Sequence, residues 1–357
     1  MLQAAADRYD YTPLLRRTDP TIAPLIPIDL VQAVDVAAEM TGDLTATLPL
    51  IADIWQQVSP DLDTTANMLG VLAAFTTTAT AAGATAWHDV PTELIAEFIH
   101  APGPSAGDVC RLRKNVVHGA YLALYDAGLF DVVSPAAGVD PVPGQVRTDD
   151  RGSVRTATHD EMLILRLASR LAVSSRAVHL SAAAVAICSA SATTTEAPQV
   201  LWGHADLTGD ARQLALAGSP SATNDDEARI EARIVTLDPW EAEVLTDWHT
   251  ELQAKDKPGK TSRVAPATSV LYTGKQALDS NSAHVGADQQ VRKAFAIADL
   301  GRELGFSAGS LRLWAAARHV TSFATLITGA TIAGIDPFTL HRQVTRGNDH
   351  GRARTRA

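Results

Sequence analysis

Apolar residues recur every three or four positions along most of the chain, a spacing that predicts amphipathic helices rather than strands. Between Leu30 and Asp131 this spacing is almost uninterrupted, so the first third of the protein is expected to be helical. A shorter helix is expected to open near Asp89 and to continue through Ile99. The two clearest runs are Leu48, Ile51, Ile54 and Trp55, and Met68, Val71, Leu72 and Phe75.

The best-defined helix boundaries lie around residues 105–125. Ser105 is a suitable N-cap with Asp108 three residues later, and Gly128 supplies a stop after Tyr125. The residues expected to form the buried stripe of this helix are Leu112, Val116, Ala120 and Leu124. The basic side chains that flank the stripe are Arg111, Arg113, Lys114 and His118.

The helical pattern stops after this helix. Residues 132–157 are rich in proline, glycine and charge and show no sustained period, which is typical of a linker. Thr158 and Glu161 then stand at capping-box spacing and predict the start of a second strong helix. Its apolar positions are Leu163, Leu167 and Leu171.

Strand-like segments are confined to the second half of the chain. The candidates are 199–202, 228–237 with its alternating Ile230, Ile234 and Val235, and 270–272. Helical spacing returns at 289–304 and at 310–328. The pattern therefore predicts an α+β protein that is mainly α-helical and has a small β-sheet.

Composition restricts the possible classes of protein. With 357 residues and 46% hydrophobic content, the chain can form two domains with cores and is not expected to be disordered. The longest nearly apolar run, 180–190, is too short to cross a bilayer, and the N-terminus lacks a signal-peptide pattern. Cys110 and Cys188 have no metal-ligand spacing and are interpreted as buried thiols of a cytoplasmic protein. No cofactor is expected.

The formal net charge of −10 argues against a protein that coats nucleic acid with its whole surface. Basic residues are instead concentrated locally. Residues 341–357 hold five arginines against Asp349, and residues 105–125 hold three cations against Asp108. Any DNA contact must therefore be made by local basic surfaces on an acidic body. The stretch after Gly347 lacks apolar anchors and is expected to be a disordered tail.

Several separate stretches match the motifs of a known family. They are AWHDV at 86–90, Phe98-Ile99, the basic stretch 111–125 and Gly128-Leu129. Together they resemble the core-binding domain of the tyrosine recombinases, also called the phage-integrase family. In that domain a basic helix contacts the DNA backbone and groove. Residues 158–161 resemble the T-x-x-E start of the first helix of the family's catalytic domain.

The first motif of that catalytic domain normally reads G-L-R-x-S-E-L-x-x-L-x-W-x-D-I-D. Thr195-Glu196 matches its S-E pair, and Trp202 falls six residues after Glu196, as the motif requires. Asp206 stands at the final acidic position, whereas Thr193 takes the place of the arginine. Residues 235–240, VTLDPW, resemble the V-x-L-D-x-W start of a later helix.

The resemblance implies strand cleavage by a tyrosine hydroxyl, assisted by two arginines, a hairpin lysine and two further His or Trp positions. The family's H-x-L-R-H box reads GSLRL here, so Arg312 is retained while Gly309 and Leu313 replace the histidines. The hairpin spanning about 208–235 contains no lysine, and its basic residues are Arg212, Arg229 and Arg233.

The nucleophile is missing as well. No tyrosine follows Tyr272, and the mid-340s, where the tyrosine is expected, read QVTR. The nearby groups are interpreted as structural: His319, Ser322, His341 and Thr345. The resemblance therefore implies a recombinase-shaped protein that does not cut DNA.

The domain plan implied by the resemblance is a loose leader at 1–29, a helical core-binding domain at 30–131, a linker at 132–157, a catalytic-fold domain at 158–340 and a basic tail at 341–357. The predicted function is accessory or regulatory DNA binding in recombination or integration. Two alternatives stay open, a divergent but active site-specific recombinase and a protein–protein scaffold without DNA affinity. Expected partners are double-stranded DNA, a second copy and a catalytically intact recombinase. The expected DNA-contacting residues are Arg111, Arg113, Lys114, His118, Arg312, Arg342 and Arg346.

Overall fold

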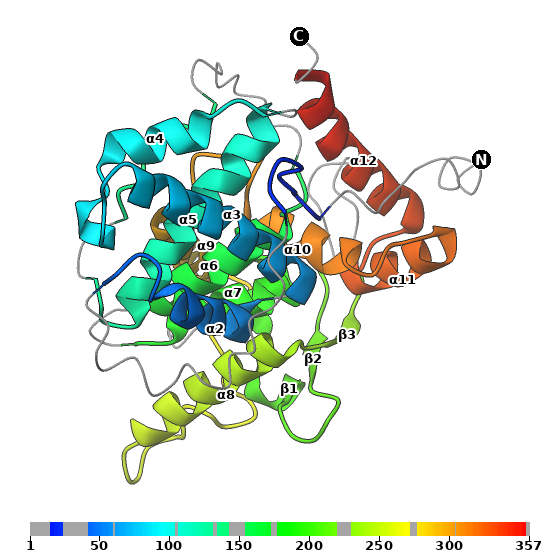
Figure 1. The fold of residues 1–357 in the computed structure, drawn as a ribbon. Coiled ribbons are helices and arrows are strands. Elements are labelled where there is room, and N and C mark those ends of the chain that lie inside the picture. The colour runs from blue at the N-terminus through cyan, green and yellow to red at the C-terminus, as the bar shows by residue number, and fades with distance from the viewer. Residues whose placement is uncertain are drawn as a thin grey trace. The chain divides into compact units, whose positions relative to one another are not determined.

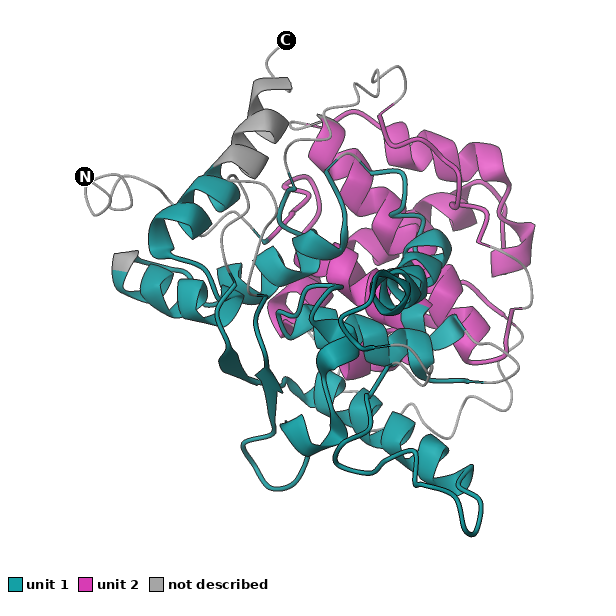
Figure 2. Cartoon of the chain, turned by 180° about the vertical axis from the view of Figure 1, so that it is seen from behind, with its two compact units in different colours: residues 1–15, 149–157, 169–353 teal, residues 16–148, 158–168, 354–357 magenta. Residues whose placement is uncertain are grey.

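The computed structural model describes ten stretches of the chain. They are residues 15–23, 42–59, 61–103, 106–130, 134–142, 154–172, 177–219, 230–271, 277–303 and 305–354. The chain divides into two compact units, shown in teal and magenta in Figure 2. Unit 1 contains residues 1–15, 149–157 and 169–353, and unit 2 contains residues 16–148, 158–168 and 354–357.

Unit 2 is built from helices. They are α2 (Leu48–Val58), α3 (Leu62–Ala81), α4 (Thr92–His100), α5 (Ala106–Asp126) and the first part of α6 (His159–Leu171). The aromatic centre of its core joins Phe75, Phe98, Trp87 and Tyr121 by edge and tilted contacts with ring centroids 5.1 to 6.0 Å apart. The Tyr121 hydroxyl donates to the Trp87 carbonyl at 3.0 Å, so its burial leaves no unmet donor.

The buried stripe predicted along α5 is confirmed, since none of its four residues is more than 1% exposed. The helix stops as predicted. Gly128 has a φ of +70°, and the amide of Leu129 donates to the Leu124 carbonyl at 2.9 Å. The predicted N-cap Ser105 lies outside the described residues.

The predicted start of α6 is also confirmed. The amide of Thr158 donates to Oε2 of Glu161 at 2.9 Å, one half of a capping box. Leu163 and Leu167 are buried, while Leu171 is half-buried. Residues 158–168 group with unit 2 and the last residues of α6 with unit 1. The assignment of residues 30–131 to a core-binding domain and of residues 158–340 to a catalytic-fold domain stays a prediction.

The expectation of a loose leader is wrong for residues 15–23. Leu15 is 8% exposed and Asp19 1% exposed. The guanidinium of Arg17 donates to Glu161 at 2.7 Å and to Asp160 at 3.4 Å. Asp19 accepts from Nε of Arg113 at 2.8 Å. Buried charge pairs, which a hydrophobic pattern cannot reveal, hold residues 16–23 on the helices of unit 2.

Unit 1 surrounds helix α7 (Leu180–Ser189), which is buried from Ser181 to Ser189. Helices α8 (Pro239–Ala254), α9 (Asn281–Ile297) and α10 (Ala308–Ala317) pack against it (Figure 1). The small side chains of α7 allow this close approach on all sides. Helices α11 (Phe323–Ala333) and α12 (Pro337–Arg354) complete the helical part of the unit.

A three-stranded antiparallel sheet lies in the same unit. Its order is β1 (Ala205–Asp206), β2 (Gln213–Leu216) and β3 (Arg233–Thr236), and Leu214 pairs with Ala205 and with Val235. The protein is therefore mainly helical with a small β-sheet, as the sequence pattern predicted. No helix in the described stretches is long and apolar enough to cross a membrane.

Three local predictions of secondary structure are wrong. In place of a strand at 199–202 there are two 3-10 turns, Ala197–Gln199 and Trp202–His204, with an isolated bridge from Leu201 to Ser269. The described part of 270–272 contains no strand. The amide of Val270 donates one hydrogen bond to the Val200 carbonyl, which does not extend into a ladder. The helix expected at 310–328 is two helices separated at Ser322, which caps the second.

The fourth difference concerns the basic tail. Helix α12 continues to Arg354, where the sequence predicted disorder after Gly347. The helix is fixed at its start, where Asp336 accepts from the amide of Thr339 at 2.9 Å and Pro337 occupies the first turn. Leu340 and Val344 anchor it by burial. The later residues continue the helix that these anchors begin.

Candidate functional site

The candidate site lies where α7 ends, because the residues that match the recombinase motif follow that helix. The helix closes in a Schellman arrangement, in which the amides of Ser191 and Ala192 donate to Cys188 and Ile187 at 3.0 and 3.1 Å. Ser191 occupies the left-handed position of this turn with a φ of +95°, which glycine usually fills. Its hydroxyl donates to the carbonyl of Ile332 at the end of α11.

Glu196 organises the turn that follows. Its Oε2 accepts from the amide of Thr193 at 2.9 Å and from the Thr193 hydroxyl at 3.1 Å. The Thr193 hydroxyl in turn accepts from the amide of Glu196 at 3.1 Å and lies 2.8 Å from the hydroxyl of Thr195. Thr193, which stands where the motif has arginine, therefore serves as a local cap.

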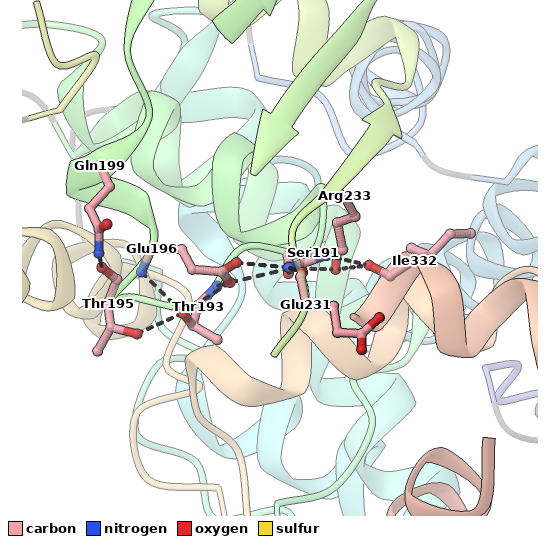
Figure 3. Close-up of polar contacts among 8 residues, drawn as sticks. All are labelled: Ser191, Thr193, Thr195, Glu196, Gln199, Glu231, Arg233 and Ile332. Carbon is pink, nitrogen blue, oxygen red and sulfur yellow. Dashed lines mark hydrogen bonds and ion pairs between the residues drawn. The ribbon is translucent and has the colours of Figure 1, made fainter. Parts of the chain in front are cut away.

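Arg233 of β3 is the ion-pair partner of Glu196 (Figure 3). Its Nη1 donates to Oε1 of Glu196 at 2.7 Å and its Nη2 to Oε2 at 3.2 Å. The remaining donors go to backbone carbonyls: Nε to Ile332 at 2.8 Å, Nη1 to Glu231 at 3.1 Å and Nη2 to Ser191.

All three guanidinium nitrogens of Arg233 are thus engaged inside the protein. The side chain of Arg233 is 3% exposed and that of Glu196 is fully buried. Gly334 lies so close that a β-carbon there would stand 2.9 Å from Nη1 of Arg233. We call these residues the Glu196–Arg233 cluster. It comprises Ser191, Thr193, Glu196, Arg233 and the carbonyl of Ile332, and its polar groups bond to one another inside the protein. It offers no donor to a phosphate.

A thiol lies just before the cluster. Burial, together with the charges of Glu196 and Asp288, raises the pKa of Cys188 to about 12. The thiol is therefore protonated at neutral pH and is not a nucleophile. Both Cys110 and Cys188 are buried and free, as the sequence analysis interpreted them. In the described stretches, no group of three histidine, cysteine or acidic side chains is placed to hold a metal ion.

Helix α10 carries the segment that matches the family's H-x-L-R-H box. A β-carbon at Gly309 would stand 3.2 Å from a methyl group of Val154, so a histidine there requires Val154 to move. Leu313 is 2% exposed and belongs to the core. Arg312, between them, is half-buried. Neither replaced position can supply a proton or a charge to a substrate.

Two hydroxyl groups downstream of α10 have structural roles. Ser322 caps α11 by accepting from the amide of Thr325 at 3.4 Å, and the hydroxyl of Thr345 donates to the His341 carbonyl at 2.8 Å. Val344, in the segment where the family's tyrosine is expected, is 1% exposed. His319 follows α10, and partial burial of its ring, with the charge of Arg318, lowers its pKa.

The predicted DNA-contacting residues of α5 differ in exposure. Arg111 keeps 20% of its side chain exposed and lies 3.4 Å from Asp108. Arg113, Lys114 and His118 are between 2% and 6% exposed. Arg113 also donates to the Ala101 carbonyl at 2.7 Å, besides its pair with Asp19.

The remaining predicted contacts lie in unit 1. Arg312 and Arg342 are half-buried, and the side chain of Arg346 lies outside what the structure describes. Residues 111–118 belong to unit 2, so the predicted contacts are divided between the two units.

Sequence reasoning found Glu196 and missed its partners. A signal for Ser191 was present in the motif: counting back two positions from Thr193 places Ser191 at the motif's glycine. The signal for Arg233 was weaker. Arg233 and Val235 share the buried face of β3, while Ile234 is 69% exposed.

Comparisons with known proteins give two solved structures. No family model matches, and no curated protein matches. One structure is described as XerA recombinase, at 13% identity over 82% of this chain and 90% of that chain, with a TM-score of 0.34. The other is XerH site-specific recombinase bound to palindromic difH substrate, at 14% identity over 87% and 97%, with a TM-score of 0.39. At these TM-scores the likeness carries no conclusion about activity.

Proposed function

We propose that this protein is a recombinase-like, non-cleaving binder of duplex DNA that acts as an accessory or regulatory factor in recombination or integration. One observation carries the proposal. At three positions where the recombinase pattern places a charge or a proton donor, this chain has residues that supply neither. Thr193 is a local cap, Gly309 packs on Val154, and Leu313 belongs to the core.

The local geometry after α7 supports the register of the recombinase pattern. The motif begins with glycine, and the residue at that position, Ser191, has a φ of +95° although it is not glycine. Left-handed backbone is costly for a serine, so this conformation is imposed by the turn and not by the residue type. The buried Glu196 at the motif's S-E pair fits the same register.

The chemistry expected of these residues is binding without cutting. Cleavage of a phosphodiester needs positive charge on the phosphate and an acid for the leaving oxygen. Arg233, the basic residue of β3, has its nitrogens committed to Glu196 and to backbone carbonyls. A catalytically intact recombinase partner would then have to supply strand cleavage.

The proposal assigns phosphate contacts to those predicted cations that reach the surface. On α5 this is Arg111, since Arg113 is tied to Asp19 and Lys114 is buried. In unit 1 the proposal assigns the same role to Arg312 and Arg342. Such contacts position a protein on DNA without reading its sequence.

The test is fluorescence anisotropy of a labelled random duplex at low and moderate salt. We expect binding that weakens steeply with salt, and weaker binding by Arg111→Glu than by the charge-matched control Arg292→Glu, on an exposed position of α9. No binding by the unaltered protein at low salt would favour the protein–protein scaffold. Equal affinity of the two variants would remove the assignment of Arg111.

Cleavage is tested separately. The protein is incubated with a nicked duplex that traps covalent intermediates, and the mixture is resolved on a denaturing gel. We expect no protein–DNA adduct. A covalent adduct would overturn the non-cleaving proposal in favour of a divergent active recombinase, and peptide mapping of the adduct would identify its nucleophile.

A further inference from the structure

The loop that follows α8 carries a concentration of positive charge on an otherwise acidic chain. It is called the basic loop here and comprises residues 255–263, with four cations against the single carboxylate of Asp256. It forms a tip of unit 1 beyond the end of α8 (Figure 1). The cations are Lys255, Lys257, Lys260 and Arg263.

A tight turn sets the geometry of the loop. The amide of Lys260 donates to the Lys257 carbonyl at 3.1 Å across Pro258 and Gly259. Gly259 has a φ of +73°, so Pro258 and Gly259 occupy the two central positions of a type II turn. The first and last residues of such a turn have α-carbons within about 7 Å of each other. The turn therefore holds the two lysines close together.

The one carboxylate of the loop is used to fix the backbone. Asp256 accepts from the amide of Arg263 at 2.9 Å and from the hydroxyl of Ser262. These hydrogen bonds, with the charge of Arg263, lower the pKa of Asp256, which therefore stays ionised at neutral pH. The carboxylate of Asp256 thus stabilises the backbone of the loop.

The segment that directly follows the basic loop is anchored to the 3-10 turn at Trp202–His204. The amide of Gly203 donates to the Pro266 carbonyl at 2.9 Å, and the amide of Trp202 donates to Thr268 at 3.0 Å. A β-carbon at Gly203 would stand 3.0 Å from the Pro266 carbonyl, so the two segments are in close contact. A preordered loop loses less conformational entropy on binding.

Three of the four cations face solvent, and the loop's own carboxylate, Asp256, interacts electrostatically with one of them, Arg263. Lys255 pairs with Glu251, but Lys257, Lys260 and Arg263 form no ion pair within the described stretches. The other exposed residues of the loop are proline, glycine and threonine. Protein–protein interfaces usually centre on apolar or aromatic side chains, which this loop does not expose. A polyanion with repeated charges fits the loop better.

We propose that the basic loop binds the phosphate backbone of duplex DNA, as a contact surface separate from Arg111, Arg312 and Arg342. This rests on the proposed function. Lysine recognises phosphate as a point charge, so the loop adds affinity and salt dependence but does not select a base sequence. Lys257, Lys260 and Arg263 make the contacts, while Lys255 stays with Glu251.

The test compares two triple variants by DNA anisotropy over a salt series. One is Lys257→Gln, Lys260→Gln and Arg263→Gln, and the other neutralises three exposed cations elsewhere in unit 1, Arg292, Lys293 and Arg302. Each lost phosphate contact lowers the slope of log affinity against log salt by about 0.9. We expect the loop variant to lose about two to three in slope and the control variant to match the unaltered protein.

The outcomes separate the two proposals. If the unaltered protein binds DNA and the loop variant keeps its affinity and slope, the role of the basic loop is refuted while the proposed function stands. If the unaltered protein does not bind at low salt, both fall. Thermal unfolding of the triple variant checks its fold, and the single variant Lys260→Gln, expected to lose about 0.9 in slope, gives a second reading.

Discussion

Arg233 meets Glu196 through two parallel bonds, with Nη1 2.7 Å from Oε1 and Nη2 3.2 Å from Oε2. This bidentate pair joins β3 to the turn after α7, two segments that are 37 residues apart in the sequence. Neither side chain is more than 3% exposed. The pair is therefore a structural contact within unit 1.

The first prediction concerns this pair. Arg233→Met leaves the carboxylate of Glu196 buried without its cation, and we expect the free energy of unfolding to fall by about 3 to 5 kcal/mol. The additional change Glu196→Gln removes the stranded charge and is expected to recover part of that loss. Urea unfolding of the two single variants and the double variant completes the cycle. Additive losses in the double variant would show that the two side chains do not act as a pair.

The second prediction concerns Ser191, whose φ of +95° is unfavourable for any residue except glycine. Ser191→Gly removes the backbone strain and loses the hydroxyl bond to Ile332, whereas Ser191→Ala loses the same bond and keeps the strain. We expect the glycine variant to be more stable than the alanine variant by about 1 kcal/mol.

Thermal or urea unfolding of the two Ser191 variants measures this difference directly. Because both lack the hydroxyl, its contribution cancels in the comparison. Equal stability, or a more stable alanine variant, would show that the left-handed conformation does not persist in solution.

The third prediction uses two neighbouring arginines. Arg17 is 10% exposed and pairs with Asp160 and Glu161, each 1% exposed, whereas Arg16 is 48% exposed and pairs with Asp61 and Asp63 near the surface. Arg17→Gln is expected to cost about 3 kcal/mol and Arg16→Gln less than about 1 kcal/mol.

Chemical unfolding of these two variants tests whether the segment 15–23 is part of the fold. The substitutions are the same and one residue apart, so Arg16→Gln is a matched control. Similar small losses for both would mean that the segment is not held on unit 2, as a loose leader would predict.

The helix pattern and the caps could be predicted from the sequence because both depend on local spacing. The stripe of α5 and the cap of α6 at Thr158 were found in this way, and the resemblance to the family motif indicated the start of α8 at Asp238. The V-x-L-D-x-W match corresponds to a full capping box between Asp238 and Glu241, with bonds of 2.9 Å in both directions. Such signals lie within four residues of each other.

The rest depends on partners that are far apart in the sequence. The pairs Arg17–Glu161 and Arg113–Asp19 span 144 and 94 residues, so residues 15–23 read as a polar leader and Arg113 as a surface cation. In β3 the charged residue is buried and the apolar residue is exposed. Arg233 is buried because Glu196 and three backbone carbonyls accept its hydrogen bonds, and Ile234 faces outward. Hydrophobicity could not reveal either arrangement.

The fourth prediction concerns His159, which is 8% exposed. Burial lowers its pKa from 6.5 to about 4, more strongly than the nearby carboxylates of Asp61 and Asp160 raise it. Between pH 6.5 and 4 the unfolded chain therefore binds a proton that the folded protein does not. The free energy of unfolding is expected to fall as the pH falls through this window, by at most about 1.4 kcal/mol per pH unit.

The measurement is urea unfolding of the unaltered protein and of His159→Gln at pH 7, 5.5 and 4.5. The variant cannot take up the proton, so we expect its stability relative to the unaltered protein to improve as the pH falls. His319 and His341, whose pKa values are also lowered by burial, act in the same direction but are common to both proteins and cancel in the difference. The pKa of Glu251 is lowered from 4.5 to about 2 by its bonds to Lys255 and to the amides of Val178 and His179, so its contribution is lost as the pH falls from about 4.5 to about 2, and this loss is also common to both proteins. Parallel stability curves for the two proteins would show that His159 is not buried in its neutral form.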